Sequence, residues 1–438
     1  MLRQLLAPLS VTAAGLSQLA AAQDVFAHVI VGNTFAYDVS QWEADIRQAA
    51  SYGIDAFVLN VAQPFSGSTA TQMSYSFQAA NNLASEVEFK MFFSFDYKAN
   101  GAWSKSDVIE VMTAYGPNGA YYLVDGKPMV STFEGPDNSS DWPGIRSSLA
   151  DVTGGIYFVP DWTSIQGSFP VDLVDGAFSW NMWPDGPTDI SSDGDTAWQD
   201  QIGSKSYMMG VSPWFYTNLP QYNKAWVWRG DTMWYDRWVQ TTTVLPRFVE
   251  IVTWNDYGES HYIGPIHGAG IPSGAGGYVN GYPHTAWLET LPYQIAAYKH
   301  AYNPSSPAPS VDANKIVYWY RNAPASAGTT DAVGNNCYTD INIYGYQTCY
   351  APSEILQDEV FAIVLATGPT TASITIGSST QTFDVTAGIN FISKPFAGNT
   401  GAVSVSMAGG SVSSTGDVEI ISNPGVANFN AWVGCAGC

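Results

Sequence analysis

Short apolar runs recur along the first 254 residues, and segments with helical periodicity separate most of them. These runs are mostly continuous stretches of β-branched and aromatic residues rather than alternating patterns. Such continuity is typical of strands buried on both faces of a parallel sheet. The eight runs are residues 25–31, 56–61, 90–95, 128–133, 155–159, 176–180, 207–211 and 248–254.

The segments between the runs predict helices at residues 73–87, 106–115, 141–149, 197–202, 231–245 and 286–302, and a further helix after the first run. For that first helix, Ser40 is the expected N-cap, with Glu43 completing a capping box. Trp42 and Ile46 then form its apolar face, and Gly53 ends it. The segment between the fifth and sixth runs, residues 163–175, is short and has an irregular pattern.

Eightfold alternation of strands and helices predicts an α/β fold, a (β/α)8 TIM barrel over residues 23–302. An open doubly wound sheet is the alternative. Neither a G-x-G-x-x-G motif nor a P-loop follows the first run, which removes the usual nucleotide-binding sites.

The composition changes beyond a Pro/Ser-rich linker at residues 303–311. Residues 312–438 carry short strand-like runs separated by Gly, Ser, Thr and Pro, which predicts a C-terminal all-β sandwich. The expected strands are residues 315–320, 360–366, 373–376, 382–385, 389–392, 402–407 and 418–421. This accessory domain is either a carbohydrate-binding module or a domain that packs on the barrel.

The first 22 residues have the pattern of a signal peptide. Arg3 supplies the positive charge, residues 5–19 are apolar, and three alanines precede the expected cleavage before Gln23. No other run approaches the ~18 apolar residues that a spanning helix needs. We therefore expect a secreted protein, extracellular or held in a cell wall, with no membrane association.

Secretion permits disulfides, and four cysteines allow three connectivities. Proximity in the sequence favours one bond between Cys337 and Cys349 and another between Cys435 and Cys438. The sequon at Asn138 predicts an N-glycan on the surface.

The charge balance is acidic, with 16 Lys and Arg against 38 Asp and Glu. Nucleic acids and anionic membranes need basic patches, so this balance argues against both as partners. The 16 Trp and 25 Tyr suit core packing and also stacking on sugar rings. A monomer is the default expectation.

Residues that directly follow the apolar runs are expected to meet at one rim of a barrel, where active sites lie. Carboxylates, amides and aromatic side chains dominate this set, and cations are few. Zinc sites prefer closely spaced His or Cys, and phosphoryl transfer requires Lys, Arg and Mg²⁺. Two carboxyls with aromatic neighbours suit glycoside hydrolysis without a metal or other cofactor.

The last run leads into residues 248–264, which read FVEIVTWNDYGESHYIG. The apolar part ends at Trp254, and Asp256 and Glu259 follow it. Their spacing permits either ~5–5.5 Å between carboxyls, as in retaining hydrolases, or ~6.5–9.5 Å, as in inverting ones. A serine esterase is disfavoured because G-x-S-x-G is absent.

Four motifs resemble glycoside hydrolase family 71, the fungal α-1,3-glucanases or mutanases. They are FAHVIVGNT at residues 26–34, GIDAFVLN at 53–60, FSFD at 93–96 and TWNDYGESHYIGP at 253–265. The resemblance implies a TIM barrel with an appended β-sandwich and inverting endo-hydrolysis of α-1,3-glucan without a cofactor. It also implies that Asp256 and Glu259 are the catalytic carboxylates.

For the roles of the two carboxylates, we expect Glu259 to be the general acid and Asp256 the general base, although the sequence permits the reverse. The candidate substrate-binding residues are His28, Asn60, Asp96, Glu134, Trp180, Trp214, Asn255, Tyr257 and His261. A non-catalytic glucan-binding wall protein and a hydrolase of another α-glucosidic linkage are the alternatives. Residues 61–67 lack the acid that we expect in this family after the second strand, which affects specificity and rate more than reaction class.

Overall fold

The computed structural model describes residues 23–222, 224–329 and 350–438. The predicted signal peptide, Cys337 and Cys349 therefore lie outside the described residues. Within these ranges, no helix is both long and apolar enough to cross a membrane.

A curled parallel sheet occupies the N-terminal part, and each of the eight predicted runs overlaps one of its strands. The strand order is β6-β5-β3-β2-β1-β11-β8-β7, with the short β4 (Leu123–Val124) antiparallel to β5. The parallel strands are β1 (Asp24–Ile30), β2 (Ala56–Ala62), β3 (Lys90–Asp96), β5 (Lys127–Phe133), β6 (Tyr157–Phe158), β7 (Gly176–Ser179), β8 (Ser206–Val211) and β11 (Phe248–Ile251). Asp161 makes isolated parallel bridges to Phe133 and to Phe178, and so links the β5 side of the sheet to β7.

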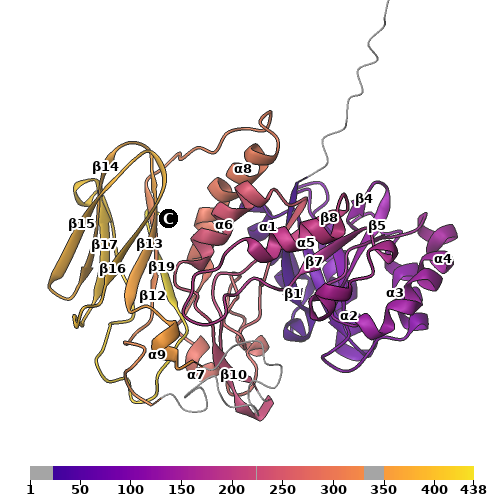
Figure 1. The fold of residues 1–438 in the computed structure, drawn as a ribbon, viewed down its shortest axis with the longest axis horizontal. Coiled ribbons are helices and arrows are strands. Elements are labelled where there is room, and N and C mark those ends of the chain that lie inside the picture. Colours follow the sequence, from indigo (N-terminus) through magenta and orange to yellow (C-terminus); the bar gives the residue numbers. More distant parts are fainter. Residues whose placement is uncertain (1–22, 223, 330–349) are drawn as a thin grey trace, which may run out of the picture.

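Helices follow most of these strands along the chain (Figure 1). They are α1 (Val39–Ser51), α2 (Gly67–Asn82), α3 (Lys105–Tyr115), α4 (Trp142–Thr153), α5 (Asp193–Ile202), α6 (Met233–Val244) and α8 (Leu291–Tyr302). After β6 the chain forms only the 3-10 turns η3 (Thr163–Ser168) and η4 (Val171–Leu173), in agreement with the irregular pattern there.

The N-cap of α1 is Asp38, so the expected cap at Ser40 is wrong. The Asp38 carboxylate accepts a hydrogen bond from the Gln41 backbone N–H at 3.0 Å, and the Gln41 side chain accepts one from the Asp38 N–H. Ser40 already lies within the first turn, where its hydroxyl donates to the same carboxylate. Trp42 and Ile46 are buried, as their spacing predicted.

The C-terminal part is a sandwich of two four-stranded antiparallel sheets, which share a buried apolar core. One sheet contains β12 (Lys315–Tyr320), β13 (Glu359–Ala366), β16 (Gly388–Pro395) and β19 (Trp432–Ala436). The other contains β14 (Thr370–Ile376), β15 (Ser379–Val385), β17 (Val403–Met407) and β18 (Val412–Thr415). Residues 418–421, expected as a strand, form only an isolated bridge at Ile420, so that expectation was wrong.

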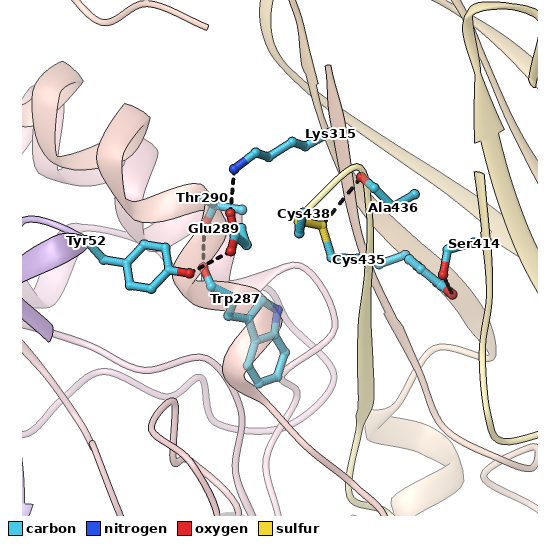
Figure 2. The surroundings of a disulfide bond; sticks show 10 residues. Tyr52, Trp287, Glu289, Thr290, Lys315, Ser414, Cys435, Ala436 and Cys438 are labelled. Atoms are coloured by element: carbon cyan, nitrogen blue, oxygen red, sulfur yellow. Dashed lines mark hydrogen bonds and ion pairs between the residues drawn. A yellow bond between two sulfur atoms is a disulfide. The ribbon is translucent and has the colours of Figure 1, made fainter. Parts of the chain in front are cut away.

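Polar contacts join the two parts of the chain. Glu289, which precedes α8, accepts hydrogen bonds from Tyr52 at the end of α1 and from Lys315 at the start of β12 (Figure 2). Cys435 and Cys438 form the predicted disulfide nearby. Asn138 is half-buried in the 3-10 turn η2 (Pro136–Asp141).

Candidate active site

The loop after β11 folds back on itself and is fixed at both ends by backbone hydrogen bonds. The Thr253 N–H donates to His261 O at 2.8 Å, and the Ile263 N–H donates to Thr253 O at 2.9 Å. The Trp254 N–H donates to His28 O, which ties the loop to β1. Residues 255–260 therefore form a loop whose two ends are hydrogen-bonded to each other.

Asp256 and Glu259 lie together in this projecting segment. The Asp256 N–H donates to Thr253 Oγ1 at 2.7 Å, and Asp256 Oδ1 accepts a hydrogen bond from the Glu259 N–H at 3.1 Å. One oxygen of each carboxyl lies within 4.8 Å of the other. The local turn thus brings the two side chains to the same place.

Both oxygens of Glu259 contact basic side chains. Oε1 lies 2.7 Å from the ammonium of Lys224, and Oε2 lies 3.0 Å from His261 Nε2. Lys224 begins β10 (Lys224–Val227), which forms an antiparallel hairpin with β9 (Tyr216–Leu219). The Tyr216 N–H donates to Glu259 O at 3.0 Å, so the hairpin contacts both the backbone and the side chain of this residue.

The two carboxyls have opposite electrostatic environments. Burial, and then repulsion from Glu259, raise the pKa of Asp256 above its usual value. Burial also acts to raise the pKa of Glu259, but the ammonium of Lys224 and the contact with His261 outweigh it and hold that pKa well below its usual range. Of the two, Asp256 is thus the carboxyl that holds a proton more readily, and Glu259 is the one that stays ionised.

A pocket of about 250 Å³ opens beside the two carboxyls. The hairpin contributes Leu219 and Lys224, and Tyr222 between its strands is 55% exposed. The lining residues are Ile30, Asn33, Leu219, Tyr222, Lys224, Asp256, Gly258, Glu259 and Pro272. An exposed aromatic ring beside paired carboxyls suits a sugar ligand.

Three residues predicted for substrate binding lie in or next to the carboxylate loop. His261 contacts Glu259 directly, and its Nδ1 lies 3.1 Å from Thr253 Oγ1. Asn255 is fully buried, and its side-chain amide exchanges two hydrogen bonds with the backbone of Ile30. Tyr257 is also buried and donates its hydroxyl to Pro265 O. Asn255 and Tyr257 therefore hold the loop in place.

The remaining predicted residues do not line this pocket. Trp214 is fully buried and donates to Phe429 O, so it lies at the contact between the two parts of the chain. Asp96 accepts from the N–H groups of the turn after β3, and Glu134 accepts from Ser164. Asn60 is buried in β2.

The buried His28 of β1 and the half-buried Trp180, which follows β7, contact each other. His28 Nδ1 is 2.6 Å from Oε1 of the buried Glu250. The Trp180 ring meets the His28 ring edge-on, with 5.4 Å between the centroids. Burial raises the pKa of Glu250, and the hydrogen bond to His28 opposes that rise.

Asp256, Glu259 and His261 each offer one ligand atom within 4.8 Å of the others, a spacing that could hold a metal ion. Glu259 Oε2 and His261 Nε2 already contact each other directly at 3.0 Å, so part of this donor set is satisfied without a metal. Lys224 also places a positive charge against Glu259.

Sequence reasoning missed Lys224, Tyr222 and the hydroxyl of Thr253. Lys224 belongs to neither a predicted strand nor a predicted rim position, and it is 35 residues from its partner Glu259. A signal was present in the scarcity of cations, since Lys224 is the single cation among five aromatic residues in the span 215–228.

Comparison with known proteins gives consistent results. The sequence model described as glycosyl hydrolase family 71 matches residues 21–437. The glucan endo-1,3-alpha-glucosidase of Schizosaccharomyces pombe is 38% identical, and the match covers 94% of this chain and 94% of that protein. A mutanase of Penicillium rubens is 33% identical over 94% of this chain and 88% of its own length.

Among solved structures, a family 99 endo-alpha-mannosidase from Bacteroides thetaiotaomicron is similar with a TM-score of 0.46 and 14% identity. The match covers 62% of this chain and 81% of that one.

Proposed function

This chain belongs to glycosyl hydrolase family 71, and from this membership we propose that it is a secreted hydrolase that cleaves α-1,3-glucan within the polymer. The observation that carries the proposal is the placement of Asp256 and Glu259 at one pocket, in environments that shift their pKa values in opposite directions. A glycoside hydrolase needs one carboxyl that donates a proton and one that accepts or attacks.

We assign the general acid to Asp256 and the general base to Glu259, the reverse of the roles expected from the sequence. The Asp256 carboxyl protonates the glycosidic oxygen as the bond from that oxygen to C1 breaks. Glu259 takes a proton from the water whose oxygen bonds to C1. Lys224 and His261 support this assignment because they stabilise the anionic form of Glu259 before the reaction.

The inverting course of this proposal rests on the family resemblance. One oxygen of each carboxyl lies within 4.8 Å of an oxygen of the other, which is nearer the ~5–5.5 Å of retaining hydrolases than the ~6.5–9.5 Å of inverting ones, so the distance does not carry the inverting course. Attack by water on the face opposite the leaving oxygen converts an α linkage into a β-anomer. The anomer of the first product therefore decides the stereochemistry.

The domain boundaries form part of the same proposal. We assign residues 1–22 to a signal peptide, 23–302 to a closed (β/α)8 barrel, 303–311 to a linker and 312–438 to the sandwich. The bridges of Asp161 to Phe133 and Phe178 support closure, because they join the two ends of the strand order.

The test is product release from insoluble α-1,3-glucan by the purified protein, with early anomers read by NMR. Asp256→Asn and Glu259→Gln are each expected to lose activity by about 10²–10⁴-fold, the usual contribution of a general acid or base. Glu110→Gln, an exposed carboxyl on α3, is the matched control and should retain the wild-type rate.

Three outcomes would contradict the proposal in different ways. A protein that sediments with the glucan but releases no sugar is a binding protein. If the protein releases sugar from an α-1,4-glucan in preference to the α-1,3 polymer, it is a hydrolase of another α-glucosidic linkage. Wild-type rates in both carboxyl variants remove Asp256 and Glu259 from the mechanism.

A further inference from the structure

Three residues of the C-terminal sandwich lie against the carboxylate loop. Phe429, Asn430 and Ala431 directly precede β19, and each is at most 1% exposed. Burying the amide of an asparagine costs free energy unless hydrogen bonds replace its contacts with water. The buried Asn430 therefore needs hydrogen-bond partners within the protein.

Each of the three residues contacts a neighbour of the loop. The Phe429 ring meets the Tyr216 ring edge-on, with 5.6 Å between the centroids. Asn430 Nδ2 donates to Tyr278 O at 2.9 Å and to the Tyr262 hydroxyl at 3.3 Å. Ala431 O lies 2.9 Å from His284 Nε2.

Those neighbours in turn contact the backbone that carries the carboxyls. The Tyr216 N–H donates to Glu259 O at 3.0 Å, and the Tyr278 hydroxyl donates to Gly258 O at 2.7 Å. The Tyr262 ring stacks on His284 with 4.0 Å between the centroids, and Tyr262 itself belongs to the loop. Residues 429–431 therefore contact the loop indirectly through three single residues, namely Tyr216, Tyr278 and His284.

We propose that residues 429–431 position the catalytic loop, with Asn430 as the central positioning residue, so that the sandwich is a working part of the catalytic unit. This inference rests on the proposed function. Small displacements of reacting groups are costly, since about 1 Å of misplacement can lower a rate by about 10²-fold. The placement favours a domain that packs on the barrel over an independent carbohydrate-binding module.

The test compares Asn430→Ala and Tyr278→Phe with the control Asn390→Ala, whose side chain bonds within the sandwich, to Val364, Thr386 and Gly388. We expect kcat on soluble α-1,3-gluco-oligosaccharides to fall about tenfold to a hundredfold in the first two variants. KM should change less than about twofold, because the pocket walls stay in place. The control should retain both constants.

Hydrogen–deuterium exchange of the peptide that contains residues 253–264 gives a second readout without substrate. The exchange rate of this peptide should rise in Asn430→Ala and in Tyr278→Phe but not in Asn390→Ala. If Asn430→Ala does not fold, Asn430→Leu decides the question, because it keeps a side chain of similar size without the amide that donates to Tyr278 O and the Tyr262 hydroxyl.

The outcomes separate this inference from the proposed function. Unchanged kcat and unchanged exchange in both variants, even with a lower melting temperature, would overturn it and leave a purely structural contact. A wild-type protein that releases nothing from α-1,3-glucan would instead refute the proposed function. The exchange experiment would then still show whether residues 429–431 hold the loop.

Discussion

The ammonium of Lys224 lies 2.7 Å from Oε1 of Glu259, in an ion pair between a hairpin inserted after β8 and the loop after β11. The Glu259 side chain is 17% exposed, so water screens the pair only partly. His261 contacts the other oxygen of the same carboxylate. This pair makes the two neighbouring carboxyls chemically different.

Replacing Lys224 with Met should move the acidic limb of the kcat/KM profile to higher pH. The ion pair lowers the folded-state pKa of Glu259, so the active anion persists as the pH falls. Without the ammonium, protonation of the base begins at a higher pH and activity is lost sooner. Lys224→Arg should keep the limb near its wild-type position. An unshifted limb in Lys224→Met would refute this role of the lysine.

The roles of the two carboxyls can be distinguished with an α-1,3-gluco-oligosaccharyl fluoride, whose leaving group needs no protonation. Asp256→Asn should regain most of its activity on this substrate, because a missing general acid matters little there. Glu259→Gln should stay about 10²–10⁴-fold slower than wild type, because it lacks the base. The measurement is fluoride release at saturating substrate. Rescue of Glu259→Gln alone would restore the assignment expected from the sequence.

Thr253→Val should lower kcat about tenfold. The Thr253 hydroxyl accepts a hydrogen bond from the Asp256 N–H at 2.7 Å. It also lies 3.1 Å from Nδ1 of His261, whose other ring nitrogen contacts Glu259, so it helps to hold both carboxyls in place. Losing one hydrogen bond in a buried site also costs about 1–3 kcal/mol of stability, which urea unfolding would measure. Thr243→Val, at an exposed position of α6, is the control. A wild-type kcat in Thr253→Val would show that the loop keeps its shape without this hydroxyl.

Asp231 should make the protein less stable as the pH rises from about 4 to about 7. Burial raises its pKa from the usual 3.8 to about 7, so the folded state binds a proton that the unfolded state releases in this window. Each pH unit there costs about 1.4 kcal/mol at most. The Gln357 N–H donates a hydrogen bond to Asp231 Oδ2 at 2.8 Å, and the amide oxygen of the variant Asp231→Asn can still accept it.

The measurement is the free energy of unfolding in urea at a series of pH values. The slope between about pH 4 and pH 7 should be flatter in Asp231→Asn than in wild type. Equal slopes would show that Asp231 is ionised in the folded protein.

Local patterns were sufficient for most of the strands. Each parallel strand overlaps one predicted apolar run, because a strand covered on both faces is built mostly from apolar side chains. Predictions failed where two local signals compete. Ser40 and Asp38 both suit a helix N-cap, and the sequence does not show which of them lies outside the first turn.

The candidate site was predictable in part for the same reason. Asp256 and Glu259 are three residues apart in one loop, so their proximity is a local property. Trp214 shows the limit of that reasoning. It follows a strand as a subsite residue would, but it contacts Phe429, 215 residues further along the chain.

The sequence by itself determined the α/β and all-β parts, the family motifs and the pair of candidate carboxyls, because apolar runs and short spacings are local features. Only the tertiary structure shifts the pKa values of the two carboxyls in opposite directions. That depends on burial, on His261 and on Lys224, which the hairpin brings to Glu259 from 35 residues away. Ionisation responds to distance and solvent exposure in space, and neither can be read from order along the chain.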